Sequence, residues 1–217
     1  MGYDSVMTPP SARRSHQERV TESTQRLLSA AVELIAENGL QHTTGVEIGQ
    51  RAGYSKEMVR ARYGSKEGLI KELLETEYEP LLLRAPDDEH TGLQQLRDQI
   101  DLIRSEVARN PQLMRAFFVL CFEAVGTLTS IRPWMIDWSS RYQGQLAAAL
   151  RRGQQDGSVN ADLDPDAEAA AIMGLALGRA YYWTLDPDSV DLVTEVTAWC
   201  DQLEARYGNP HRHNCAQ

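Results

Sequence analysis

Residues 43–69 read TTGVEIGQRAGYSKEMVRARYGSKEGL, and this stretch decides how the chain folds. Thr44 followed by Glu47 is the pattern of a capping box, in which a hydroxyl and a carboxylate each bond an amide that a helix start leaves free. Gly53 then breaks the short helix and permits a tight turn before a second helix. Two short helices joined by a glycine-containing turn predict a helix-turn-helix at residues 44–63.

The second of these helices starts at Ser55, a favourable N-cap, and has two unlike faces. Because residues i and i+4 share a helix face, Lys56 and Arg60 project on one side, while Val59 and Tyr63 can pack back on the preceding helix. A helix with these faces can present cations to the phosphates and base edges of DNA, although a helical hairpin with a charged surface would show the same pattern. The residues predicted to contact DNA are Thr44, Ser55, Lys56, Glu57, Arg60, Arg62, Tyr63 and Lys66.

The net charge of −9 argues against a nucleic-acid partner only until it is divided along the chain. Residues 1–66 carry nine Lys and Arg against seven Asp and Glu, whereas residues 67–217 carry thirteen against twenty-four. Between Arg51 and Lys66 there are five basic residues and one acidic residue, a local footprint suited to phosphates. Arg13 and Arg14, ahead of the first helix, are either a minor-groove arm or a disordered basic tail.

Helical periodicity runs through the whole chain, and no segment predicts a strand. Asn38-Gly39 ends the first helix, and Pro111, Pro133 and Pro165 suit first helical positions. The fold class is therefore all-α, with nine helices expected near residues 20–38, 44–52, 55–63, 70–81, 93–107, 111–128, 133 to between 153 and 157, 165–185 and 192–203.

Other classes of protein are disfavoured by what the sequence lacks. It contains no G-x-S-x-G, Gly-rich phosphate loop, H-E-x-x-H or C-x-x-C, so we expect no catalytic site, cofactor or metal, although an all-helical enzyme remains conceivable. His211, His213 and Cys215 could bind a metal, but a frayed terminus accounts for them better. No apolar run resembles a signal peptide or a membrane span, and the three cysteines have no metal-type spacing, so a cytoplasmic protein with no membrane partner is expected.

The order of the N-terminal signals resembles the TetR family of bacterial transcription regulators over roughly residues 21–81. One departure lies in the second helix of the motif, where Arg60, Ala61 and Arg62 replace two tyrosines and a histidine that are common in the family. Arginine at such sites can clamp phosphates or bind guanine in a bidentate manner. The matching residues are Ala30-Ala31, Glu37-Asn38-Gly39-Leu40, Thr43-Thr44, Ile48, Arg51-Ala52-Gly53, Ser55-Lys56, Tyr63, Ser65-Lys66-Glu67 and Leu69.

The resemblance implies a helix-turn-helix DNA-binding domain at 21–81 and a ligand-binding and dimerisation domain at 82–207, in which the last two helices pair with a second copy. The penultimate helix is rich in Ala and Gly, which permits close approach of another helix, although both helices could equally serve the chain's own core. The residues predicted for the dimer interface are Ala169, Ile172, Ala176, Val193, Val196, Trp199 and Leu203.

Bulky and adaptable side chains are concentrated between the fifth and eighth expected helices, as in a small-molecule site within a helical bundle. Glu123, Asp137, Arg141 and Arg179 could supply the few polar groups of such a site. An apolar effector, aromatic or fatty, is therefore predicted, although each residue taken singly suits a core equally well. The predicted pocket residues are Met114, Phe117, Phe118, Cys121, Phe122, Trp134, Trp138, Tyr142, Met173 and Tyr181.

Together these features predict a ligand-responsive DNA-binding transcription regulator, a repressor that binds a palindromic operator as a homodimer and is released by the effector. By the resemblance, effector binding would tilt the helical domain and move the two recognition helices apart. The alternative is an all-helical interaction adaptor or a small-molecule-binding protein without specific DNA binding.

Overall fold

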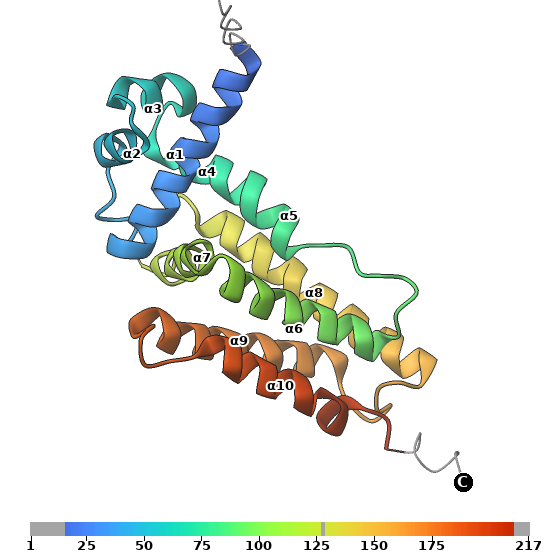
Figure 1. The fold of residues 1–217 in the computed structure, drawn as a ribbon. Helices are drawn as coiled ribbons and strands as arrows, with labels where there is room; N and C mark the ends of the chain where they lie inside the picture. Colours follow the sequence, from blue (N-terminus) through green and yellow to red (C-terminus); the bar gives the residue numbers. More distant parts are fainter. Residues whose placement is uncertain (1–15, 127–128, 211–217) are drawn as a thin grey trace, which may run out of the picture.

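The computed structural model describes residues 16–126 and 129–210. Within these ranges the fold is all-α, and the only β-type pairing is an isolated bridge between Val159 and Gly208. Figure 1 shows the helices in chain order. They are α1 (His16–Asn38), α2 (Gly45–Ala52), α3 (Lys56–Tyr63), α4 (Lys66–Leu73), the π-helical η1 (Leu74–Tyr78), α5 (Glu79–Leu82), α6 (Gly92–Arg109), α7 (Pro111–Glu123), α8 (Arg132–Asp156), α9 (Pro165–Leu185) and α10 (Leu192–Tyr207).

Helices α4, η1 and α5 follow one another without a break, so they correspond to the single fourth helix that the sequence predicts. Pro80 is the reason for the wider turn, because proline has no N–H to donate to the preceding turn and its ring crowds the carbonyl four residues earlier. With these three counted as one, the described residues form the nine helices expected.

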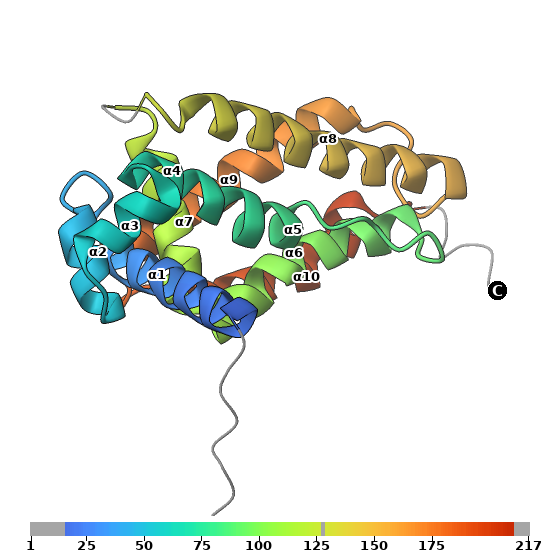
Figure 2. The ribbon, with the colours of Figure 1, turned by 90° about the horizontal axis from the view of Figure 1, so that it is seen from above.

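The helices are arranged in two parts that share one core. Helices α1–α4, the N-terminal part, lie at one end, and α6–α10, the C-terminal part, form a bundle whose last two helices make an outer layer (Figures 1 and 2). Helix α6 packs on α8 and α10, and α8 packs on α9. Helix α1 packs against α7, so the buried side chains are continuous between the two parts. The expected division between residues 81 and 82 falls inside α5.

One expected helix end is wrong. The sixth helix was expected to reach residue 128, but α7 ends at Glu123, where Arg132 donates to the carbonyl oxygens of Ala124, Val125 and Gly126 and so satisfies them outside a helix.

The seventh was expected to end between Gly153 and Gly157, and α8 ends within this range, at Asp156, with Gly157 as its C-cap. A Cβ on Gly153 would lie 2.3 Å from Val159 Cγ2, so glycine serves close packing there and not termination.

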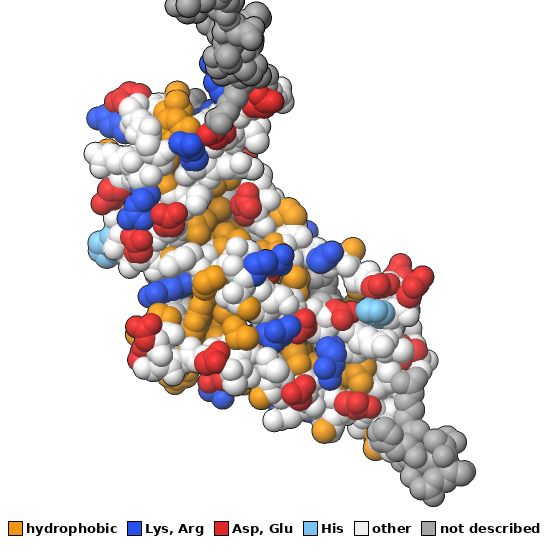
Figure 3. All heavy atoms as spheres, in the orientation of Figure 1, with side chains coloured by type: hydrophobic (Ala, Val, Ile, Leu, Met, Phe, Trp, Pro, Cys, Tyr) orange, Lys and Arg blue, Asp and Glu red, His pale blue; other side chains and the backbone are white. Residues whose placement is uncertain are grey.

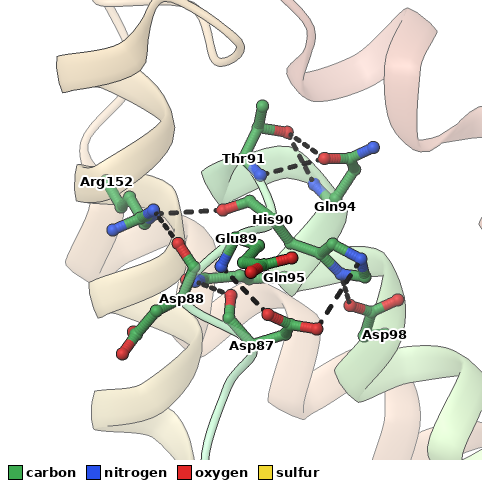
Figure 4. A network of polar contacts seen from close by, with 9 residues as sticks. All are labelled: Asp87, Asp88, Glu89, His90, Thr91, Gln94, Gln95, Asp98 and Arg152. Atoms are coloured by element: carbon green, nitrogen blue, oxygen red, sulfur yellow. Dashed lines mark hydrogen bonds and ion pairs between the residues drawn. The ribbon is translucent and has the colours of Figure 1, made fainter.

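The segment between α5 and α6 is fastened to both neighbouring helices (Figure 4). Arg152 on α8 donates to the carbonyl oxygens of Asp88 at 2.6 Å and His90 at 3.1 Å. His90 Nδ1 lies 2.6 Å from Asp98 Oδ2 on α6. The hydrogen bond to Asp98 raises the pKa of His90 above its ordinary value, against partial desolvation and with further help from Asp87 and Glu89.

The described helices include none that is long and apolar enough to cross a membrane. Over the same residues, no three His, Cys, Asp or Glu side chains are grouped as metal ligands would be. The candidate arm at Arg13 and Arg14 and the tail residues His211, His213 and Cys215 lie outside the described ranges.

Candidate DNA-binding surface and ligand cavity

The helix-turn-helix begins with the capping box that the sequence predicts. Thr44 Oγ1 accepts from Glu47 N at 3.2 Å, and Thr44 N donates to Glu47 Oε2 at 2.8 Å. The Thr44 hydroxyl and amide hold the pKa of Glu47 below its ordinary value. Gly53 ends α2 with φ of 79°, the left-handed conformation that glycine adopts without strain. A Cβ on Gly49 would lie only 3.0 Å from Ser55 O, so α2 sits directly on the turn that leads into α3.

Helix α3 has the two faces expected of it. Val59 is buried and Tyr63 is half-buried, whereas Lys56 and Arg60 are exposed. Neither cation makes a hydrogen bond or a short ion pair with another described residue. Ser55 stands at the N-cap, as expected, but its side chain makes no capping hydrogen bond. The apolar face of α3 therefore anchors the helix, and the two cations project from its opposite, exposed face.

The other basic residues of this segment point back into the N-terminal part. Arg62 donates to Val20 O, Ser23 Oγ and Thr24 Oγ1 on α1 at 2.7–3.1 Å. Lys66 Nζ donates to Leu40 O and Thr43 O, both at 2.9 Å. Arg51 pairs with Glu33 and Glu37 on α1. Three of the five basic residues counted in the sequence thus fasten α2, α3 and α4 to α1 and its following turn.

A cavity of about 330 Å³ lies within the C-terminal part, between α6, α7, α8, α9 and α10. Figure 3 shows hydrophobic side chains reaching the surface between α7 and the α9–α10 pair. Half of the predicted pocket residues line this cavity: Phe117, Phe118, Trp138, Tyr142 and Met173.

The other predicted pocket residues lie elsewhere, which corrects the sequence prediction for this cavity. Met114 is fully buried in the core, Phe122 and Trp134 pack against that core, and Tyr181 is 48% exposed. Cys121 lines a separate cavity that shares Trp138 with the first. Burial raises the pKa of the Cys121 thiol to about 12, so it stays protonated.

Some residues that line the cavity were not predicted from the sequence, and others were assigned to a different site. Ile100 and Ile103 of α6 line it but were not predicted. Four residues that were assigned to a dimer interface also line it. Helical periodicity marks such residues as inward-facing but does not say whether they meet a core, a cavity or a second chain. The four are Ile172, Ala176, Val196 and Trp199.

Few polar groups belong to the cavity wall. Trp138 Nε1 and Trp199 Nε1 are buried without a hydrogen-bond partner among the described residues. Arg179 and Glu195, on α9 and α10, form an ion pair with 3.5 Å between Nε and Oε2.

The remaining predicted polar groups do not line this cavity. Arg141 pairs with Glu79 and Asp137. Glu123 Oε2 instead accepts from Leu40 N at 2.9 Å, which joins the end of α7 to the turn after α1.

The surface of the last two helices differs from the predicted interface. Ala169, Ile172, Val196 and Leu203 are buried within the single chain, which corrects their assignment to a surface that meets a second copy. The outer face of α9 is instead a stripe of small and apolar residues. A Cβ on Gly174 or Gly178 would meet nothing within 4 Å. The exposed stripe consists of Ala170, Ala171, Gly174, Leu175, Gly178, Tyr181, Tyr182 and Leu185.

Known proteins share both the motif and the architecture. Residues 27–73 match the model of a family described as bacterial regulatory proteins, tetR family. The chain is 27% identical to the HTH-type transcriptional regulator TtgR of Pseudomonas putida over 198 residues, which cover 87% of this chain and 92% of that protein.

Two solved structures share the fold. One is SmeT, the repressor of the Stenotrophomonas maltophilia multidrug efflux pump SmeDEF, with a TM-score of 0.69 and 21% identity over 87% of this chain and 93% of that chain. SmeT is also known as a complex with triclosan. The other is FadR of Bacillus subtilis in complex with stearoyl-CoA, with a TM-score of 0.68 and 20% identity over 82% of this chain and 96% of that chain.

The family match falls on the helix-turn-helix, and the similarity to TtgR extends over most of both chains. The described fold has the same two-part helical plan as the regulators that it resembles. Residues 27–73 thus carry the DNA-binding motif of the tetR family of bacterial regulatory proteins, and over most of its length the chain is similar to transcription regulators that share its fold.

Proposed function

We propose that this protein is a ligand-responsive repressor that binds a palindromic operator as a homodimer and is released by a small, largely apolar effector. The observation that carries the proposal is the cavity of about 330 Å³ in the C-terminal part, because one of its walls, α7, also contacts the helix-turn-helix part. The N-terminal part, extending into α5, binds DNA, and the bundle that follows binds the effector and the second copy.

For DNA contact, Arg60 and Lys56 are the cations that α3 presents to the outside. Arg60 reaches base edges, together with Lys56 or Glu57, and Lys56, Thr44 and Ser55 bind the DNA backbone. Arg62, Tyr63 and Lys66 act mainly by positioning, since Arg62 and Lys66 use their donors on α1 and the turn after it.

For assembly, the outer face of α9 supports a second copy better than the residues first assigned. Small residues at Gly174 and Gly178 permit close approach of a partner helix, and Tyr182 and Leu185 supply apolar area beside them. Val193 and Trp199 are half-buried on α10 and can contribute at the edge. A two-fold dimer implies a palindromic operator with half-sites about one helical turn, ~34 to 36 Å, apart.

For the effector, the aromatic and aliphatic walls favour a compound that is mostly apolar. The triclosan and stearoyl-CoA complexes of the two fold relatives support an effector of this kind. An effector that binds better to the DNA-incompetent conformation shifts the population away from DNA, and a coupling of about 1 to 3 kcal/mol lowers operator affinity roughly 5- to 150-fold.

The test is selection of bound sequences from random DNA with the full chain, followed by affinity measurement at two salt concentrations. A palindromic consensus and a steep loss of affinity with salt are expected. Arg60→Ala should cost about 1 to 3 kcal/mol and relax the preference at one base position, while Arg151→Ala, on α8, serves as the matched control. Recovery of no consensus would favour the adaptor or the small-molecule-binding alternative.

A further inference from the structure

We propose that the cavity selects neutral, apolar ligands that carry a carbonyl-type acceptor oxygen, and that the indole N–H groups of Trp138 and Trp199 are the donors that recognise this oxygen. The proposal rests on the proposed function, because it assumes that the cavity is the effector site. It adds the chemical class of the ligand and the residues that determine it.

The first observation is that the two donors lack partners. Trp138 is only 5% exposed, and its Nε1 has no hydrogen-bond partner among the residues described. The indole nitrogen is a donor only, and a buried indole N–H ordinarily finds an acceptor. Trp199 Nε1 is in the same situation on the wall of the same cavity. Since α8 supplies one indole and α10 the other, two separate helices each contribute a partnerless donor from a residue that lines this cavity.

The second observation is that the Trp138 ring is held in place. It stacks on Tyr142 with centroids 5.5 Å apart and planes 20° from parallel, and it meets Phe117 edge-on at 4.8 Å. Burial raises the pKa of Tyr142 well above its ordinary value, so this neighbour stays neutral. A ring fixed in this way offers its N–H in one direction, which favours a particular position for an acceptor.

The third observation concerns charge. Arg179 and Glu195 are the charged pair of the cavity wall between α9 and α10, with 3.5 Å between Arg179 Nε and Glu195 Oε2, and Glu195 Oε2 is buried without a hydrogen-bond partner among the described residues. Arg206 also lines the cavity, but it is exposed and lies over the ring of Tyr207. Gln202 also lines the cavity but is exposed, and the rest of the wall is aromatic and aliphatic, so a charged ligand would lose its hydration there without a dedicated partner. A neutral acceptor, as in a ketone, ester or amide, fits the two donors.

The experiment compares benzophenone with diphenylmethane, which have similar shapes and differ in the carbonyl group. Binding of each to the full-length protein is measured by equilibrium dialysis. We expect benzophenone to bind about tenfold more tightly, since one neutral hydrogen bond typically changes affinity by about two- to tenfold and two donors are available. Trp138→Phe and Trp199→Phe should each reduce this ratio several-fold while diphenylmethane still binds.

Trp183→Phe is the matched control, because it makes the same change on α9, does not line this cavity, packs on Phe118 and not on either indole donor, and should leave the ratio as it is. If a variant still binds diphenylmethane, its cavity is intact. Trp199 is only half-buried, so Trp199→Phe provides the test if Trp138→Phe fails to fold. Equal affinities for the two probes, or a ratio unchanged in both variants, would overturn the selection proposed here and leave the effector site standing. Binding of neither probe would overturn the effector site together with this inference.

Discussion

The two parts of the molecule use polar side chains in opposite ways. In the N-terminal part, Thr44 caps α2, and Arg62 and Lys66 donate to α1 and to the turn after it, so these polar groups are satisfied within the chain, although the Tyr63 hydroxyl is buried without a partner among the described residues. In the C-terminal part, the cavity wall leaves the N–H groups of Trp138 and Trp199 without a partner. The first arrangement stabilises one conformation of the motif, whereas the second leaves binding capacity for a molecule from outside.

The largest effect is expected where the C-terminal part is proposed to meet a second copy. Gly178→Arg places a long cation on the exposed stripe of α9, where a Cβ meets no neighbour within 4 Å in the single chain. We expect a folded monomer whose operator affinity is about 100-fold lower or worse, because two half-sites no longer bind as one unit.

Sedimentation velocity and DNA titration would measure these two effects. Gly144→Arg, on the outer face of α8 and equally unobstructed, is the matched control and should remain a dimer. A Gly178→Arg protein that is dimeric at micromolar concentration would rule out the α9 face as the interface.

The next largest effect should come from removing the hydrogen bonds that hold Lys66 to the turn after α1. Lys66→Met removes the two donor bonds to Leu40 O and Thr43 O, and we expect the free energy of unfolding to fall by about 1 to 3 kcal/mol. Lys71→Met is the control, since Lys71 is largely exposed and its ion pair with Glu75 should contribute less than about 0.5 kcal/mol. Urea denaturation measures both. If Lys66→Met kept its stability and instead reduced the salt dependence of DNA binding, Lys66 would be a phosphate contact.

A smaller effect is expected at the contact that joins the two parts. Glu123→Gln weakens the bond from Leu40 N to the carboxylate, while the side chain keeps its size beside Gly39. Release of DNA by benzophenone should become about two- to fivefold less effective, with ligand affinity in the absence of DNA little changed. Asp137→Asn, in an exposed pair with Arg141, is the control. Unchanged release in Glu123→Gln would show that coupling passes elsewhere.

The smallest effect is a dependence on pH at the segment between α5 and α6. The folded-state pKa of His90 is raised by Asp98, so the stabilisation is fully present below the unfolded pKa of about 6.5 and is lost as pH rises through the higher folded value. His90→Gln should therefore lower the Tm slightly at pH 6 and less at pH 8. Equal Tm changes at the two pH values would contradict this assignment.

The local structure of the motif was predicted well from the sequence, because helix capping, turn formation and helical periodicity depend on residues only a few positions apart. The capping box of Thr44 and Glu47, the left-handed Gly53 and the inward face of Val59 depend on neighbours in the chain. The direction of Arg62 and Lys66 was not predictable, because it depends on where α1 lies, some 23 to 42 residues away in the chain.

The same limit explains the C-terminal part. Ile172 and Val196 were recognised as inward-facing, but assigning them to a cavity required the packing of five helices. Trp134 and Trp138 are the same residue type four positions apart on α8, and their rings stack, yet only Trp138 lines the cavity. Periodicity gives the side of a helix and not the depth or the neighbour that a side chain meets.

The π-helical turn η1 shows how the helix between the two parts accommodates an additional residue. A π turn holds one residue more than the α-helical turn that it replaces, so Leu74–Tyr78 takes up one extra residue while keeping α4 and α5 continuous. Removing one residue from this turn and closing it as α-helix would leave the two flanking segments in nearly the same relative orientation, because the wider turn already takes up the extra residue. The π turn thus accommodates one additional residue between α4 and α5 without breaking the helix or redirecting the segments on either side.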